Sequence, residues 1–108
     1  MESTRKQLCT DMKIVSAQMD KACDQVRQLD NEILQVKQRY QKAKNSGRPA
    51  FCNSHRLRLD MLERTRTMLY AYACARGDEL EILQSDYRLN ERKRNQAQLK
   101  QELLQMQA

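Results

Sequence analysis

The feature that most constrains this sequence is a repeat of apolar residues that begins near its amino terminus. Successive apolar residues lie alternately four and three positions apart over five heptads. A period of about 3.5 residues winds helices around each other in a left-handed supercoil. The repeat therefore predicts a coiled-coil helix, whose seam consists of Leu8, Met12, Val15, Met19, Ala22, Val26, Leu29, Ile33, Val36, Tyr40 and Ala43.

A turn is expected where glycine and proline first enter the sequence. Gly47 and Pro49 follow a stretch from residue 4 that contains neither residue type. A glycine in the left-handed conformation can end a helix, and proline prevents the helix from continuing. The prediction is a first arm of about residues 4–45, a turn of about 46–54 and a second arm of about 55–106.

The second arm has a less regular seam than the first. Its apolar positions are Leu59, Leu62, Leu69, Ala73, Leu80, Leu83, Tyr87, Ala97 and Leu104. Polar residues interrupt it at Arg66, Arg76, Asn90, Arg94 and Gln101. Because an unpaired buried charge is costly, we expect the arginine stems to cover the seam while their heads reach solvent or an acidic group.

The two arms are predicted to fold back on each other as an antiparallel hairpin. One register satisfies the whole seam, with facing pairs Tyr40 and Leu62, Val36 and Arg66, and Val15 and Tyr87. In this register residues 98–108 have no counterpart on the first arm. A parallel dimer whose chain turns back is the alternative.

Gly77 is the only other point at which the second arm could break. Asp78 and Glu81 follow it with the spacing of a capping box, which would permit a stop and a restart. Because a restart would need a turn with almost no loop, one continuous helix is the favoured prediction.

Apolar residues outside the seam indicate that the hairpin has a partner. A helix that is apolar over so wide an arc needs two neighbours, and a lone two-helix hairpin buries little area per residue. The predicted fold class is therefore all-α, a long antiparallel coiled-coil hairpin completed to a bundle by another chain. The residues predicted to bind that chain are Leu57, Met61, Met68, Tyr72, Leu99, Leu103 and Met106.

The charge of the chain is concentrated around the predicted turn. Residues 37–66 hold nine basic residues against two acidic ones, a net charge of +7 compared with +6 for the whole chain. This basic tip comprises Lys42, Lys44, Arg48, Arg56, Arg58 and Arg64. It could contact an acidic protein partner, acidic microtubule tails or nucleic-acid phosphate, or serve solubility alone. Only Tyr40 and Phe51 supply aromatic rings nearby, which disfavours nucleic acid.

The sequence contains no motif that is typical of catalysis, of cofactor binding or of a metal site. Cys52 and His55 have the nearest spacing to a metal site, but two ligands do not hold zinc, and we expect a loop cysteine and a histidine at a helix start. A two-helix structure offers no concavity for nucleophilic catalysis. We expect no enzyme, cofactor or metal. The four cysteines lack paired spacing and are expected to be reduced thiols.

These patterns predict a structural or adaptor subunit that assembles with another coiled-coil protein or with itself. The second hypothesis is that the basic tip docks on cytoskeletal or axonemal microtubules or on nucleic acid. The longest apolar run, residues 68–75, is far shorter than the roughly 20 residues of a membrane span. We expect no membrane contact and a cytoplasmic protein, with the cytoskeleton and the nucleus as alternatives.

Overall fold

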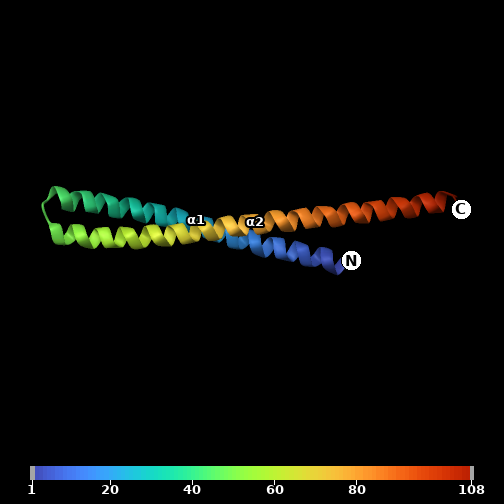
Figure 1. Cartoon of the computed structure of the whole chain (residues 1–108), viewed down its shortest axis with the longest axis horizontal. Coiled ribbons are helices and arrows are strands. Elements are labelled where there is room, and N and C mark those ends of the chain that lie inside the picture. The colour runs from blue at the N-terminus through green and yellow to red at the C-terminus, as the bar shows by residue number, and fades with distance from the viewer. Residues whose placement is uncertain (1, 108) are drawn as a thin grey trace. The chain divides into compact units, whose positions relative to one another are not determined.

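Two α-helices make up the chain in the computed structural model, which describes the backbone of residues 2–107 and the side chains of residues 4–107. Helix α1 is Glu2–Asn45 and helix α2 is Pro49–Gln107 (Figure 1). Their contacts divide the chain into a hairpin unit, residues 18–75, and a terminal unit, residues 1–17 and 76–108. Each helix contributes to both units.

In the hairpin unit, α1 and α2 run antiparallel on either side of the turn (Figure 1). Every seam position predicted for this part of α1 is buried or half-buried, and Val36 is the most enclosed, with 1% of its surface exposed. Residues of the same helix outside the seam, such as Leu34, face solvent. The prediction of an all-α, antiparallel coiled-coil hairpin is confirmed. The buried residues of this unit are Ala22, Val26, Ile33, Val36, Ala43 and Ala73.

The terminal unit pairs the start of α1 with the later part of α2. Val15 and Leu83 are its buried apolar residues. Every residue from Arg92 to Gln107 is exposed, including Leu104, which the sequence placed in the seam. Helix α1 does not extend beside this part of α2. Arg5, near the start of α1, already pairs with Glu91, so the α2 residues beyond Glu91 have no α1 residues to pack against.

The turn is built by Gly47, the one described residue with a positive φ, at 69°. The Gly47 N–H donates to the Lys44 carbonyl at 3.2 Å, and the Arg48 N–H donates to the Ala43 carbonyl at 3.1 Å. These two bonds form the Schellman motif, which satisfies carbonyls left open at a helix end. Pro49 then begins α2, where its missing N–H costs no helical bond.

This turn is shorter than predicted, because α2 begins at Pro49 and not near residue 55. The earlier start moves the predicted register by about seven residues, or one heptad. In the hairpin unit Arg66 bonds Asp30 and does not face Val36, and in the terminal unit Tyr87 bonds Arg5 and does not face Val15. A shift of a full heptad returns each apolar position to the seam, so the pattern alone cannot detect it.

Two other details follow from the course of α2. The helix continues through Gly77, so the predicted continuous helix is confirmed and the stop and restart is wrong. Cys52 is a half-buried helical residue and not an exposed loop residue, and His55 is half-buried one turn later. Both continue the seam spacing back from Leu59, which the predicted turn of about residues 46–54 had hidden.

Burial predicts a large difference between two neighbouring substitutions on α1. Val36→Ala removes two buried methyl groups and should lower the free energy of unfolding by about 1–2 kcal/mol. Leu34→Ala, a larger deletion at an exposed position, should change it by less than about 0.5 kcal/mol. Urea unfolding followed by circular dichroism measures both, and equal losses would contradict the seam.

Candidate functional site

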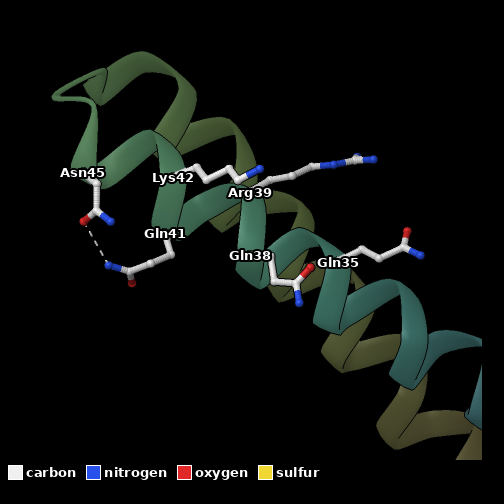
Figure 2. Close-up of a pocket in the computed structure, with 6 residues that line it drawn as sticks. All are labelled: Gln35, Gln38, Arg39, Gln41, Lys42 and Asn45. Carbon is white, nitrogen blue, oxygen red and sulfur yellow. Dashed lines mark hydrogen bonds between the residues drawn. The ribbon is translucent and has the colours of Figure 1, made fainter.

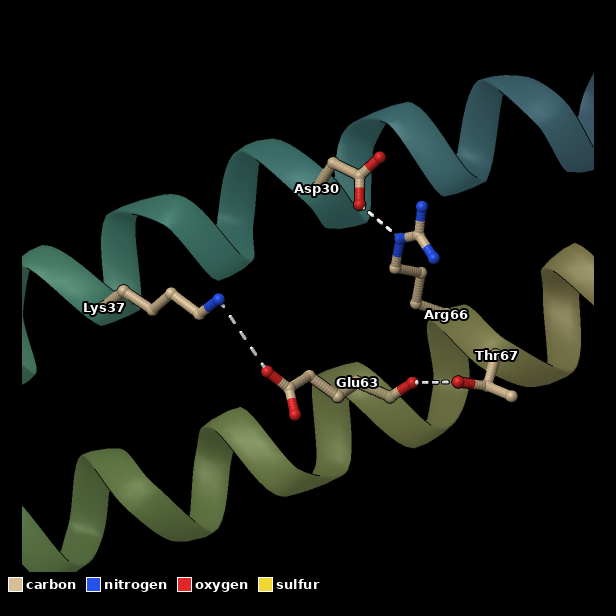
Figure 3. A network of polar contacts seen from close by, with 5 residues as sticks. All are labelled: Asp30, Lys37, Glu63, Arg66 and Thr67. Carbon is tan, nitrogen blue, oxygen red and sulfur yellow. Dashed lines mark hydrogen bonds and ion pairs between the residues drawn. The ribbon is translucent and has the colours of Figure 1, made fainter.

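The seam between the helices contains charged residues as well as apolar ones. The residues outside the seam form the outer surfaces of the helices. Arg66 of α2 is half-buried in the hairpin unit, and its guanidinium bonds the Asp30 carboxylate of α1 (Figure 3). The same guanidinium lies over the Tyr70 ring, 5.8 Å from the centroid. The hydrogen bond with Asp30, with its charge, raises the pKa of Arg66. The expected acidic partner of this arginine is therefore within the chain.

The terminal unit has a related arrangement, in which the arginine lies on α1 and both the ring and the carboxylate lie on α2. Arg5 of α1 donates to the Tyr87 hydroxyl of α2 at 3.1 Å and forms an ion pair with Glu91 at 3.1 Å. Its guanidinium also lies 5.7 Å from the centroid of the Tyr87 ring. The bond to Tyr87, followed by the charge of Glu91, raises the pKa of Arg5. An arginine beside a ring and a facing carboxylate thus holds the helices in each unit.

Further ion pairs flank the seam of the hairpin unit. Arg58 lies 2.7 Å from Glu32, and Lys37 lies 4.0 Å from Glu63 (Figure 3). All four side chains remain substantially exposed, so each pair contributes at most about 1 kcal/mol. Arg58 therefore differs from the other residues of the predicted tip, because it already forms an ion pair with the Glu32 carboxylate of α1.

An outer stripe of apolar side chains lies on α2 in the hairpin unit, and we define it as Leu57, Met61 and Met68. Met68 is 74% exposed, and the other two are similarly open. Tyr72, predicted with them, is the least exposed at 45% and borders the seam. The structure thus leaves the predicted partner-binding residues of this unit largely in solvent.

A second apolar surface lies on α2 in the terminal unit. The predicted residues Leu99, Leu103 and Met106 are exposed, and so are Ile82 and Leu89. Ile82, Leu89 and Leu103 share one heptad position, and Leu99 and Met106 share the position one turn away, so all five lie on one face of α2. We call these five residues the C-terminal face. Ile82 and Leu89 were missed in the sequence, although they repeat the seven-residue spacing of Met61 and Met68.

The basic tip surrounds the turn in the hairpin unit. Its six predicted residues are all exposed. Arg48 lies over the ring of Phe51, 5.8 Å from the centroid, and Arg58 is paired with Glu32. The other four are basic side chains open to solvent: Lys42, Lys44, Arg56 and Arg64.

The described residues form several open depressions on the surface. One, in the hairpin unit, is formed by side chains of α1 alone, where Gln41 donates to Asn45 at 3.1 Å (Figure 2). Its lining is Gln35, Gln38, Arg39, Gln41, Lys42 and Asn45. Among the described residues, no three His, Cys, Asp or Glu side chains gather as metal ligands. Over the same residues, neither helix has a segment long and apolar enough to cross a membrane.

The pairing of Arg66 with Asp30 predicts a charge-specific effect on stability. Arg66→Glu places two carboxylates together at the seam and should lower the free energy of unfolding. Adding Asp30→Lys should recover most of this loss by restoring opposite charges. Urea unfolding of the single and double variants tests it, and a double variant as unstable as the sum of both singles would contradict the contact.

Two apolar surfaces and one basic surface are therefore exposed on the described residues of the two units. No protein-family model, curated protein or solved structure matches the chain.

Proposed function

We propose that this protein is a non-catalytic structural or adaptor subunit, which assembles with another coiled-coil chain or with a second copy of itself. The observation that supports the proposal is the exposure of large apolar side chains outside the seam. In the hairpin unit these are Leu57, Met61 and Met68 of the outer stripe, and in the terminal unit the five residues of the C-terminal face. Soluble proteins rarely leave such rows of apolar residues uncovered unless they bind a partner.

The spacing of these residues indicates the kind of partner. Met61 and Met68 are seven residues apart, as are Ile82 and Leu89, and Leu99 and Met106. A row with this period matches the seam of another helix and not a flat or irregular protein surface. Burying a leucine or methionine contributes about 1.5–3 kcal/mol, so a few such residues can support stable assembly.

The outer stripe gives the test of this function. The double substitution Met61→Glu and Met68→Glu should release the chain from its native complex, because two charges would have to be buried in the new seam. Size-exclusion chromatography of the complex from cells that make the protein measures this release, and circular dichroism checks that helix content is unchanged. Leu34→Glu is the control, since it adds a charge of the same sign at an exposed leucine of α1.

Retention of the double variant in a complex of unchanged size would overturn the role of the outer stripe. Release by both the double variant and the control would show that added charge alone disturbs assembly.

A second candidate function rests on the basic tip. Lys42, Lys44, Arg56 and Arg64 are exposed side chains around one turn, and none of them forms an ion pair within the described residues. Such a cluster can bind the acidic tails of microtubules by long-range attraction. Phe51, the aromatic ring at the turn, lies against Arg48, which makes nucleic-acid recognition by base stacking the weaker alternative.

Charge reversal tests the basic tip. The triple variant Lys42→Glu, Lys44→Glu and Arg56→Glu leaves the Arg58 pair with Glu32 intact. Microtubule binding at low salt should fall at least tenfold, because association through a charged patch depends on its net charge. Co-sedimentation measures binding, and a gel-shift assay with single-stranded RNA covers the nucleic-acid alternative. Unchanged binding in both assays would leave the tip without a binding role.

A further inference from the structure

An open groove in the terminal unit is lined by basic residues of both helices. Its volume is about 670 Å³, within the range of about 300–1,000 Å³ that small-ligand sites occupy. The lining consists of Arg5, Lys6, Cys9, Thr10 and Lys13 of α1 and Arg94 of α2. Four of these residues are cations, and no carboxylate is among the described residues that line the groove. The groove therefore combines space for a small molecule with an excess of positive charge.

The spacing of the α1 residues places them along one side of that helix. Lys6, Thr10 and Lys13 are four and three residues apart, so they form a row. The two lysines are separated by about 10.5 Å of helical rise. Asp11, the one acidic residue between them in the sequence, does not line the groove, whereas Arg94 borders it from α2. Cations of two helices thus surround one depression.

Three of the four cations have no counter-ion within the part of the chain that the structure describes. The fourth, Arg5, pairs with Glu91 at 3.1 Å. Lys6, Lys13 and Arg94 form no ion pair within residues 4–107, and all three are exposed. A negatively charged ligand in this groove could therefore contact three cations without displacing a carboxylate.

We propose that the groove binds a small anion that carries adjoining phosphate groups, such as a polyphosphate chain. The flexible side chains of Lys6 and Lys13 can converge on such a ligand, and their ammonium groups bind phosphate oxygens as point charges. The guanidinium of Arg94 can donate two hydrogen bonds to one phosphate. None of the lining residues belongs to the outer stripe, the C-terminal face or the basic tip, so this binding does not depend on the assembly function.

The lining favours such an anion over an acidic protein segment. Protein interfaces have apolar or aromatic side chains at their centre, and Cys9 is the least polar side chain that the groove offers. None of the described lining residues is aromatic, so a nucleotide would be held through its phosphates and not by stacking of its base. Recognition therefore depends on charge and on oxygen acceptors.

Isothermal titration calorimetry of the full-length chain with inorganic tripolyphosphate, at low salt and without magnesium, tests the proposal. We expect saturable binding at one site per chain. The double variant Lys13→Gln and Arg94→Gln should bind at least tenfold more weakly, because it removes one unpaired cation from each helix. Absence of saturable binding by the unmodified chain would overturn the proposal.

The matched control is the double variant Lys21→Gln and Arg92→Gln. It also removes one lysine of α1 and one arginine of α2, both of which are exposed and lie outside the lining. We expect a loss of less than threefold, through long-range attraction alone, and unchanged helix content by circular dichroism in both double variants. An equal loss in both variants, or no loss in either, would show that the groove is not the site.

Two single variants test whether α2 contributes to the site. Arg94→Gln should weaken tripolyphosphate binding at least threefold, whereas Arg94→Lys, which keeps the positive charge, should retain most of the affinity. Equal binding by the two variants would show that the charge of residue 94 does not reach the ligand, and would overturn a site shared by both helices.

Two further ligands identify the chemistry that the groove recognises. ATP presents the same phosphate chain on a nucleotide and should bind within about tenfold of tripolyphosphate, because no lining ring stacks on the base. Binding of tripolyphosphate without ATP would support the site and restrict its ligand to inorganic polyphosphate. A hexaglutamate peptide, which carries carboxylates in place of phosphates, should bind at least tenfold more weakly than tripolyphosphate. Equal binding of the peptide would overturn phosphate recognition in favour of an acidic protein segment.

Discussion

The structure depends on the close packing of small and branched apolar side chains along the seam between α1 and α2. Val36 is almost fully enclosed, and Ala22 and Ala43 are also buried, so the helices approach each other where side chains are short. Helices of this composition gain little stability from helix propensity alone and need burial of one face. Because the seam occupies one face of each helix, it also determines which residues are left for other contacts.

Charged residues within the seam limit the ways in which the helices can pair. Arg66 lies where an apolar residue would pack better, and Arg5 extends the seam towards the amino terminus. Each is accommodated by a carboxylate of the facing helix, Asp30 in one unit and Glu91 in the other. A polar residue at a seam position lowers stability but disfavours registers in which its partner is missing. The two arginines therefore select one alignment among several that the apolar repeat would permit.

Helix α2 differs from α1 in being apolar on more than one face. Outside the seam, the surface of α1 is mostly Gln, Lys and Asp, whereas α2 presents Leu57, Met61 and Met68 in one unit and the C-terminal face in the other. This asymmetry leaves most of the exposed large apolar side chains of the described residues on α2. The exposed segment that begins at Arg92 gives α2 a length of helix that intramolecular packing does not use.

The amino-acid sequence by itself determined the helical class and the phase of the seam, because side-chain periodicity decides which face of a helix is buried. It did not determine the register. A heptad repeat is unchanged by a shift of seven residues, so the choice fell to the turn, where Gly47 and Pro49 connect the helices with far fewer residues than expected. Only the tertiary structure could therefore decide that Arg66 meets Asp30, that Cys52 and His55 join the seam, and that α2 is uncovered from Arg92 onwards. Each of these follows from where one helix stops relative to the other, and a pattern within a single helix carries no information about that position.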